Sequence, residues 1–185
     1  MRKLVFVVLV LLASSARAAV DPDLLAGMKA RSIGPAGMSG RVAAIAAVES
    51  NPNVVYAGTA TGGLWKSTNG GLTWDPLFDD QPVSSIGAVA IYQASPDIVW
   101  VGTGEGNPRN SASIGNGVYR SLDGGKTWAH LGLEKTERIP RVVLHPTNPN
   151  VAWVAALGQE WGENPDRGVF KTVDGGKTWR KVLYV

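Results

Sequence analysis

The residues of this chain best suited to chemistry are arginines, glutamates and a tryptophan in three places along the sequence. Our candidate ligand-binding residues are Arg41, Glu105, Arg109, Glu160, Trp161 and Arg167. A guanidinium can bind a carboxylate through two parallel hydrogen bonds, and an indole offers an apolar face on which a sugar can stack. These residues therefore indicate a surface for a glycan or a peptide. The alternative interpretation is that they form ordinary ion pairs within surface loops.

Other kinds of site find little support in the residue types present. The chain has no cysteine and two histidines, His130 and His145, which excludes cysteine catalysis and cysteine-rich zinc sites. Asp79 and Asp80 are a weak pair for a cation, and solvated loop charges are the simpler interpretation. The glycine-rich stretch 102–106 is not followed by a helical pattern, so it does not indicate a nucleotide-binding loop. We expect no metal and no cofactor.

The elements that must position these residues are set by an eight-residue pattern that occurs three times. It begins at residues 67, 121 and 172, a period of about 50 residues that is typical of repeat architectures. Asn-Gly and Asp-Gly favour a tight hairpin, and the closing tryptophan can fill the gap between adjacent sheets, so we expect it to be substantially buried. The residues to which we assign this structural role are Ser67, Asn69, Gly71, Trp74, Ser121, Asp123, Gly125, Trp128, Thr172, Asp174, Gly176 and Trp179.

A second motif recurs in the same phase and completes the fold prediction. A turn centred on proline at 51–53, 95–97 and 148–150 precedes an apolar segment in every repeat. The pattern predicts an all-β chain, a partial β-propeller of about three four-stranded antiparallel blades in an open arc. We assign blades to about 41–80, 81–133 and 134–185, after a lead-in segment at 19–40. Closed propellers have four to eight blades, so we expect the N-terminal part of a longer protein.

Two of the repeats carry extra residues between their second and third strands. These insertions span 104–116 and 158–166. In a four-stranded meander this turn lies at the end opposite the Asn-Gly or Asp-Gly hairpin, so both insertions project from one face. Loop elaboration on one face of a repeat array usually marks the binding face. Arg41 begins the first inner strand near the central channel, where it either contacts a ligand or pairs with a neighbouring blade.

The N-terminus has the pattern of a secretory signal peptide. Two basic residues precede an apolar run at 4–12 and an Ala-x-Ala site at 16–18, and the run is too short to span a membrane. We expect cleavage after Ala18 and a secreted or periplasmic protein. Loss of Arg2, Lys3 and Arg17 would reduce the 18 basic residues to 15, equal to the 15 acidic ones. The mature chain would then be neutral, which argues against binding to nucleic acid.

The repeated pattern resembles the Asp-box, or BNR repeat, S-x-D-x-G-x-T-W, of sialidases, sortilin-type (VPS10) domains and many secreted bacterial propellers. Asn69 and Thr172 depart from it. With the segments 34–42, 62–67, 101–105 and 168–172, nearly the whole mature chain resembles secreted bacterial proteins with sortilin-N-terminal-like propellers, often labelled glycosyl hydrolases. The resemblance implies the propeller fold, but it does not imply a function, because Asp-boxes recur on proteins with unrelated activities.

Two catalytic templates of related propellers fit poorly. Arg138, Ile139 and Pro140 match the letters of the sialidase Arg-Ile-Pro motif, which in sialidases precedes the first Asp-box rather than entering the third repeat. Propeller-type xyloglucanases carry a catalytic Asp shortly before a Gly-Gly pair, and Ala60 stands at that place here. Glycoside hydrolysis needs a pair of carboxylates, so we lean against catalysis by this chain.

The sequence therefore predicts a secreted propeller that binds a peptide or a glycan on the face with the insertions. Its other expected partners are the remaining blades or domains of the full-length protein, and we expect neither nucleic acid nor a membrane span. The alternatives are a sialidase-like or xyloglucanase-like glycoside hydrolase with catalytic residues on other blades, and a structural scaffold for another domain.

Overall fold

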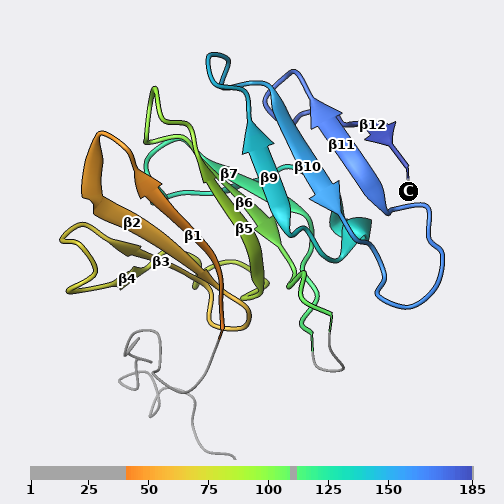
Figure 1. Ribbon diagram of the computed structural model, residues 1–185, viewed down its shortest axis with the longest axis horizontal. Helices are drawn as coiled ribbons and strands as arrows, with labels where there is room; N and C mark the ends of the chain where they lie inside the picture. The colour runs from red at the N-terminus through yellow and green to blue at the C-terminus, as the bar shows by residue number, and fades with distance from the viewer. Residues whose placement is uncertain (1–40, 109–111, 185) are drawn as a thin grey trace, which may run out of the picture. The chain divides into compact units, whose positions relative to one another are not determined.

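The described part of the chain is a row of three antiparallel sheets. The computed structural model describes residues 41–108 and 112–184, all of which belong to one compact unit of the chain. Each sheet has four strands that follow one another in chain order, as Figure 1 shows. The predicted all-β class with three four-stranded antiparallel sheets is confirmed. The predicted signal peptide and lead-in segment, residues 1–40, lie outside the described residues.

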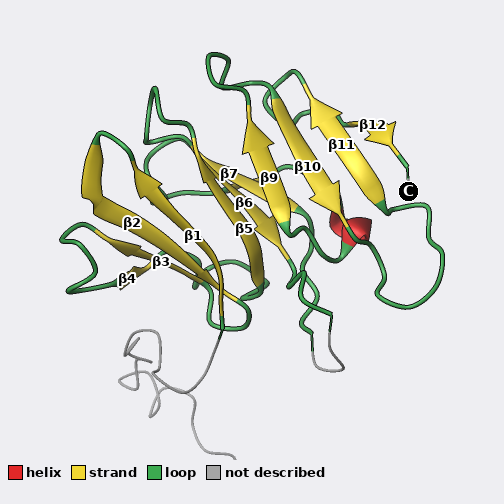
Figure 2. Cartoon of the chain, viewed as in Figure 1, coloured by secondary structure: helices red, strands yellow, loops and turns green. Residues whose placement is uncertain are grey.

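We call the three sheets blades one, two and three. Blade one contains β1 (Val42–Val48), β2 (Asn51–Thr59), β3 (Leu64–Ser67) and β4 (Asp75–Pro76). Blade two contains β5 (Ile86–Ile91), β6 (Val99–Thr103), β7 (Val118–Ser121) and β8 (Ala129–His130). Blade three contains β9 (Arg141–Leu144), β10 (Ala152–Ala156), β11 (Gly168–Thr172) and β12 (Arg180–Leu183). One 3-10 turn, η3 (Glu134–Thr136), lies in the connection between blades two and three and is drawn red in Figure 2.

The fourth strands of blades one and two are shorter than the sequence predicts. The residues that follow the first two Asp-box turns predict outer strands at about 73–78 and 126–131, whereas β4 and β8 have two residues each. The cause is the Asp-box, because the amides of Thr73 and Thr127 donate to the side chains of Asn69 and Asp123 and are held in the loop. Pairing with the third strand starts only after the closing tryptophan.

The apolar core lies between blades rather than inside any one of them. One cluster joins blades one and two and contains Val48, Tyr56, Leu64, Phe78, Ile86, Ile91, Val99, Val101 and Tyr119. A second joins blades two and three and contains Ala88, Trp100, Val118, Ile139, Val142, Ala152, Val154 and Ala156. Each sheet thus buries its faces against its neighbours, which is how blades of a propeller are stabilised.

A glycine in the second strand lets the next blade approach. A Cβ atom at Gly58 would lie 2.5 Å from Cγ2 of Ile86, the first residue of the next inner strand. Gly102 of blade two stands in the same relation to Ile139. Both positions therefore require a residue without a side chain, because a methyl group there would separate the blades.

The Asp-box tryptophans connect each blade to the one before it. Trp128 donates its indole N–H to the carbonyl of Leu77, and Trp179 donates to that of Leu131, at 2.8 and 2.7 Å. Trp74 of blade one instead donates to Gly71 in its own hairpin. All three tryptophans are largely but not fully buried, in agreement with our prediction of substantial burial. Each ring closes a hairpin at the rim of its sheet, and part of it stays in contact with solvent.

Candidate functional site

Three segments meet at the end of the blades opposite the Asp-boxes. The insertion of blade two follows β6, the insertion of blade three follows β10, and the connection 131–140 leads into β9. Backbone hydrogen bonds join them, from Ile139 N to Thr103 O at 3.0 Å and from Gly115 N to Glu137 O at 2.6 Å. We call the surface formed by these three segments the insertion face. It carries Glu105, Glu160 and Trp161, three of the candidate residues that the sequence predicts.

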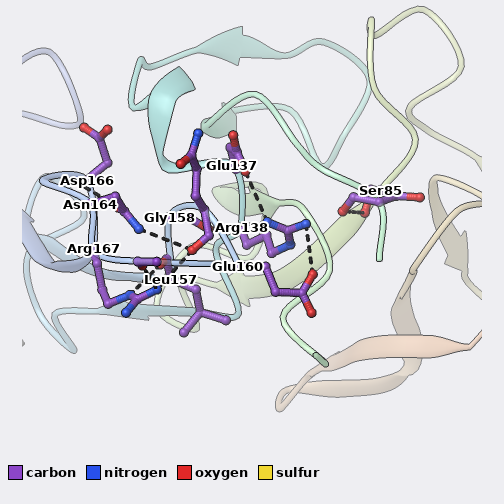
Figure 3. Close-up of polar contacts among 12 residues, drawn as sticks. Ser85, Glu137, Arg138, Leu157, Gly158, Glu160, Asn164, Asp166 and Arg167 are labelled. Atoms are coloured by element: carbon purple, nitrogen blue, oxygen red, sulfur yellow. Dashed lines mark hydrogen bonds and ion pairs between the residues drawn. The ribbon is translucent and has the colours of Figure 1, made fainter. Parts of the chain in front are cut away.

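Equivalent residues precede the inner strand of each blade, namely Arg41 directly before β1, Ser85 directly before β5 and Arg138 shortly before β9. Their carbonyl oxygens accept hydrogen bonds from the amides of Ala60, Gly104 and Leu157, at 2.9, 2.8 and 2.9 Å. The backbone at these positions therefore closes the end of each blade, whatever side chain it carries. Ser85 and Arg138 are both labelled in Figure 3.

Arg41 pairs with a neighbouring blade. Its Nε donates to Glu105 Oε1 at 2.7 Å, and its NH2 group makes a second contact with the same carboxylate. The Glu105 side chain is fully buried, whereas that of Arg41 is 41% exposed. The ion pair fastens blade one to the insertion of blade two. The sequence alone left open whether Arg41 meets a ligand or a neighbouring blade, and the structure shows the latter contact. Arg109 lies outside the described residues.

Arg138 lies at the centre of the insertion face and bridges two glutamates. Its NH1 group lies 3.1 Å from the carboxylate of Glu137, and its NH2 group lies 3.3 Å from that of Glu160 (Figure 3). Arg138 is 8% exposed, and its buried Nε has no hydrogen-bond partner. The guanidinium therefore joins the connection before β9 to the insertion of blade three and retains one unused donor.

The connection that carries Arg138 is held in an unusual backbone conformation. Leu133 and Glu137 have φ angles of 64° and 52°, a region that residues other than glycine, asparagine and aspartate rarely adopt. Such strain persists only where surrounding contacts impose it, and it is concentrated at functional sites. Here the carbonyl of Glu137 is held by Gly115 of the blade-two insertion. This hydrogen bond holds the strained connection at the point where Arg138 enters the site.

Arg167 shapes the insertion of blade three from within. Its Nε donates to Leu157 O at 2.9 Å, and its NH2 group donates to Gln159 O and Gly162 O at 3.0 and 3.3 Å. Asn164 adds a bond from its Nδ2 to Gln159 O at 3.2 Å. For this residue the structure favours the interpretation as a loop contact. Its guanidinium stabilises the loop that presents Trp161.

A cavity of about 180 Å³ lies where the two insertions meet. It is lined by Gly106, Pro108, Arg138, Leu157, Gln159, Glu160, Trp161 and Arg167. The Trp161 side chain is 73% exposed, which is unusual for a residue of this size. Glu160, Trp161 and Arg167, which the sequence singles out, are thus brought together, with Arg138 as a fourth member. Glu105 and Arg41 form a separate pair next to Gly106.

The arrangement is suited to binding rather than to acid–base catalysis. Glycoside hydrolysis needs one carboxylic acid that donates a proton and a second, ionised carboxylate. Glu137 and Glu160 are both engaged as acceptors of the Arg138 guanidinium. Ala60, at the position of the xyloglucanase carboxylate, is buried and contributes only its backbone to the closure of blade one. An exposed ring beside a small cavity with fixed polar groups is typical of a recognition site.

Sequence reasoning missed Arg138 as a site residue and considered it only as part of an Arg-Ile-Pro match. A usable signal was present, because Arg138 stands in the same repeat phase as Arg41. The ion pair between Arg138 and Glu160 joins residues 22 positions apart across an irregular connection. No local pattern predicts such a contact.

The opposite end of the blades is fixed by hydrogen bonds within the Asp-boxes. Ser121 donates to Asp123 Oδ1 at 2.7 Å, and the amide and hydroxyl of Thr127 donate to the same carboxylate at 2.9 and 2.6 Å. These bonds, the Thr127 hydroxyl first, hold the pKa of Asp123 well below its usual range. The equivalent bonds from Thr178 and Thr172 lower the pKa of Asp174 to about 2.

The departures from the Asp-box pattern preserve its geometry. Thr172 makes the hydroxyl contacts of the usual serine, with bonds of 2.8 Å to Asp174 and 2.9 Å from Gly176 N. Asn69 accepts from Ser67 and from the Thr73 amide, and its Nδ2 donates to the Thr73 hydroxyl, the reverse of the direction at aspartate. These residues thus hold the hairpins and lie away from the insertion face.

A second hollow, of about 650 Å³, follows the inner strands β1, β5 and β9. Alanines and valines line most of it, with Glu49, Gln93 and Arg141 as its polar members. Gln93 connects blades one and two, since its side chain accepts from Glu49 N and donates to Ala47 O. The hollow offers few groups for specific recognition. Within the described ranges there is no cluster of three or more His, Cys, Asp or Glu residues that could hold a metal ion.

Comparison with known proteins supports the class of fold. The profile of the BNR/Asp-box repeat matches residues 119–130, which form the second Asp-box and its flanks. The sequence matches none of the curated proteins. The chain thus carries a BNR/Asp-box repeat within a row of three four-stranded antiparallel sheets.

Solved β-propellers resemble the chain in structure. A GH74 enzyme from Niastella koreensis is 27% identical, with a TM-score of 0.56 over 75% of this chain and 21% of its own. The GH74 xyloglucanase from Xanthomonas campestris is 22% identical, with a TM-score of 0.55 over 77% of this chain and 21% of its own. YCF48, solved bound to D1 peptide, is 16% identical, with a TM-score of 0.51 over 77% of this chain and 41% of its own. This chain therefore spans about a fifth of the GH74 chains and two fifths of YCF48.

Proposed function

We propose that this chain is part of a secreted β-propeller binding module whose ligand, a peptide or a glycan, binds on the insertion face. The observation that carries the proposal is the cavity of about 180 Å³ beside Trp161, a residue that is 73% exposed. An indole held on a shaped loop gives apolar contact area at low entropic cost. The three hydrogen bonds of Arg167 to the loop carbonyls hold the loop that carries Trp161 before a ligand arrives.

The polar groups around the cavity suit a ligand that offers hydrogen bonds rather than a net charge. The charges of Arg138 and Arg167 are balanced by those of Glu137 and Glu160, so the centre of the site does not attract a strongly charged ligand. Sugar hydroxyls and peptide amides both meet this requirement. The GH74 xyloglucanase from Xanthomonas campestris and YCF48 bound to D1 peptide are among the structural neighbours, and one acts on a glycan whereas the other binds a peptide.

Binding can be tested directly with the purified protein. We would titrate it with xyloglucan oligosaccharides and with a random-peptide library, and measure binding by calorimetry and by quenching of tryptophan fluorescence. Trp161→Ala should weaken binding at least tenfold and leave the melting temperature nearly unchanged, because the ring is largely exposed. Leu122→Ala, at a 64% exposed position on an Asp-box, is the matched control and should bind normally. Equal binding by the Trp161 variant would refute the proposed site.

The second candidate function is glycoside hydrolysis, sialidase-like or xyloglucanase-like, with the catalytic residues on blades outside this chain. The 27% identity to the Niastella koreensis GH74 enzyme favours it. In that case the insertion face would supply a subsite for the sugar chain and no catalytic carboxylate. An assay of reducing ends released from xyloglucan by the full-length protein decides between binding and hydrolysis.

Export and family relationship complete the proposal. The basic and apolar N-terminus supports secretion or a periplasmic location, with cleavage after Ala18. Sequencing the N-terminus of exported protein tests this, and Ala19 is the expected first residue. Among the described residues no helix is long and apolar enough to cross a membrane. The closer relationship to sortilin-type propellers rests on the sequence segments that resemble them.

A further inference from the structure

The walls of the cavity on the insertion face come from inside the row of blades. Gly106 and Pro108 belong to the insertion of blade two, Arg138 to the connection before β9, and the other lining residues to blade three. The insertion of blade two is tied to this connection by a backbone bond from Gly115, and that of blade three by the ion pair between Arg138 and Glu160. The shape of the cavity is therefore set by contacts between blades two and three.

The cavity has the size of one large side chain rather than of a sugar residue. Its volume is about 180 Å³, and an apolar cavity of about 150 Å³ in another protein holds one benzene molecule. The side chains of leucine, methionine and phenylalanine are of that size and fit the space. A hexose residue of a glycan has nearly twice as many non-hydrogen atoms as benzene and does not fit.

The charged groups around the cavity are already used by the protein. The NH1 and NH2 groups of Arg138 lie 3.1 and 3.3 Å from the carboxylates of Glu137 and Glu160, and its Nε is buried (Figure 3). Arg167 donates to three carbonyl oxygens of its own loop. A sugar hydroxyl that entered the cavity would lose its hydrogen bonds to water and find few partners to replace them, which is unfavourable. An apolar side chain has no such bonds to lose.

The other lining residues suit an apolar group that is attached to a polar backbone. Pro108, Leu157 and Trp161 supply apolar surface to the cavity. Gln159 also lines it and is exposed, so its side-chain amide is available to exchange hydrogen bonds with a peptide group outside the cavity. The lining therefore matches a peptide that inserts one side chain.

We propose that the cavity binds one apolar side chain of a peptide, of the size of leucine, methionine or phenylalanine, while the backbone of that peptide crosses the insertion face. This assignment rests on the proposed function, and it selects a peptide over a glycan as the ligand of that site. Because the charges of the two arginines and two glutamates around the cavity balance, a neutral side chain is favoured over a charged one.

A series of peptides with glycine on both sides of one varied residue provides the test. The peptides are acetylated and amidated, so they carry no terminal charges. Binding to the full-length protein, labelled with fluorotryptophan, is followed by fluorine NMR through the signal of Trp161. Affinity should rise about fourfold with each carbon atom added from glycine through alanine and valine to leucine, because each is removed from water. Peptides with aspartate or lysine should bind no better than the glycine peptide, and xyloglucan oligosaccharides should not displace the leucine peptide.

Leu157→Ala enlarges the cavity and tests the same assignment from the side of the protein. The backbone of this residue keeps its bonds to Arg138 and Arg167, so the variant should fold, which a melting curve checks. The ratio of the affinity for the phenylalanine peptide to that for the leucine peptide should rise at least about threefold. Leu122→Ala makes the same change on an exposed Asp-box position and should keep the wild-type ratio.

The outcomes separate this assignment from the proposed function. Equal affinity for the glycine and leucine peptides would overturn the assignment, as would an unchanged ratio in Leu157→Ala. Binding of the oligosaccharides that is lost in Trp161→Ala, with no binding of the peptides, would also overturn it, but the proposed site would then stand with a glycan as its ligand. Absence of binding by every probe would refute both.

Discussion

The contribution of blade contacts to stability can be measured with a single substitution made three times. The second glycine of each Asp-box, at positions 71, 125 and 176, has a φ angle of 93°, 96° and 93°. Alanine at each position meets nearly the same backbone strain. The space around the new methyl group differs, because blades two and three have a preceding blade against their Asp-box.

The structure ranks the three costs. A Cβ at Gly71 has its nearest neighbour 3.6 Å away, on Trp74 of the same hairpin, so only strain of about 1–3 kcal/mol acts. At Gly125 it would lie 2.5 Å from a terminal methyl of Leu77, which can rotate away. At Gly176 it would lie 2.5 Å from Cδ1 and 3.2 Å from both Cβ and Cγ of Leu131, which leaves no easy escape. Overpacking there should add about 1–3 kcal/mol.

Urea unfolding followed by tryptophan fluorescence gives the three free energies of unfolding. We expect the loss to increase from Gly71→Ala through Gly125→Ala to Gly176→Ala, with an unchanged dependence on urea concentration. Gly162→Ala is the control for strain alone, since its φ is 92° and nothing lies within 4 Å of the Cβ position. It should match Gly71→Ala. Equal losses at all three Asp-boxes would show that the blades contribute no packing at these points and would refute the reasoning.

Three further predictions follow from single contacts. In the folded state the pKa of Asp174 is lowered to about 2, so its stabilising effect is present above about pH 4 and is lost as the pH falls towards 2. Asp174→Asn should therefore make the melting temperature less dependent on pH over this range. Arg138→Met should lower the free energy of unfolding by about 3 kcal/mol in urea, because it removes a partner from the largely buried Glu160. Trp128→Phe leaves the carbonyl of Leu77 without its donor and should cost about 1–2 kcal/mol in the same assay.

The parts of the fold that the sequence predicts are those fixed by local chemistry. An Asp-Gly hairpin closed by hydrogen bonds between Thr127 and Asp123 needs only residues within one loop. Because the same hairpin motif recurs along the sequence, it shows where each repeat begins and ends. The apolar segments between these hairpins then predict four strands in each repeat. Strand lengths were predicted less well, because the same loop bonds hold Thr73 and Thr127 out of the fourth strand.

The parts that the sequence does not predict depend on what lies opposite a residue. Trp74 and Trp128 occupy the same position in the same motif, yet one bonds to its own hairpin and the other to the preceding blade. Likewise, Glu105 and Glu160 both lie in insertions, but their arginine partners come from blade one and from the connection before blade three. Both outcomes are set by how the blades pack against one another, and the sequence of the motif does not determine that packing.

At the position that precedes each inner strand, the fold constrains the backbone and leaves the side chain free to vary. At Arg41, Ser85 and Arg138 the backbone carbonyl closes the end of the blade in the same way. Because the carbonyl alone meets the structural requirement, the side chain is free, and serine is sufficient in blade two. The two arginines are therefore not needed to build a blade, and each instead holds an insertion through a buried carboxylate. Loops fixed in this way present Trp161 and the cavity with little entropy left to lose on binding, which is the property that a recognition surface requires.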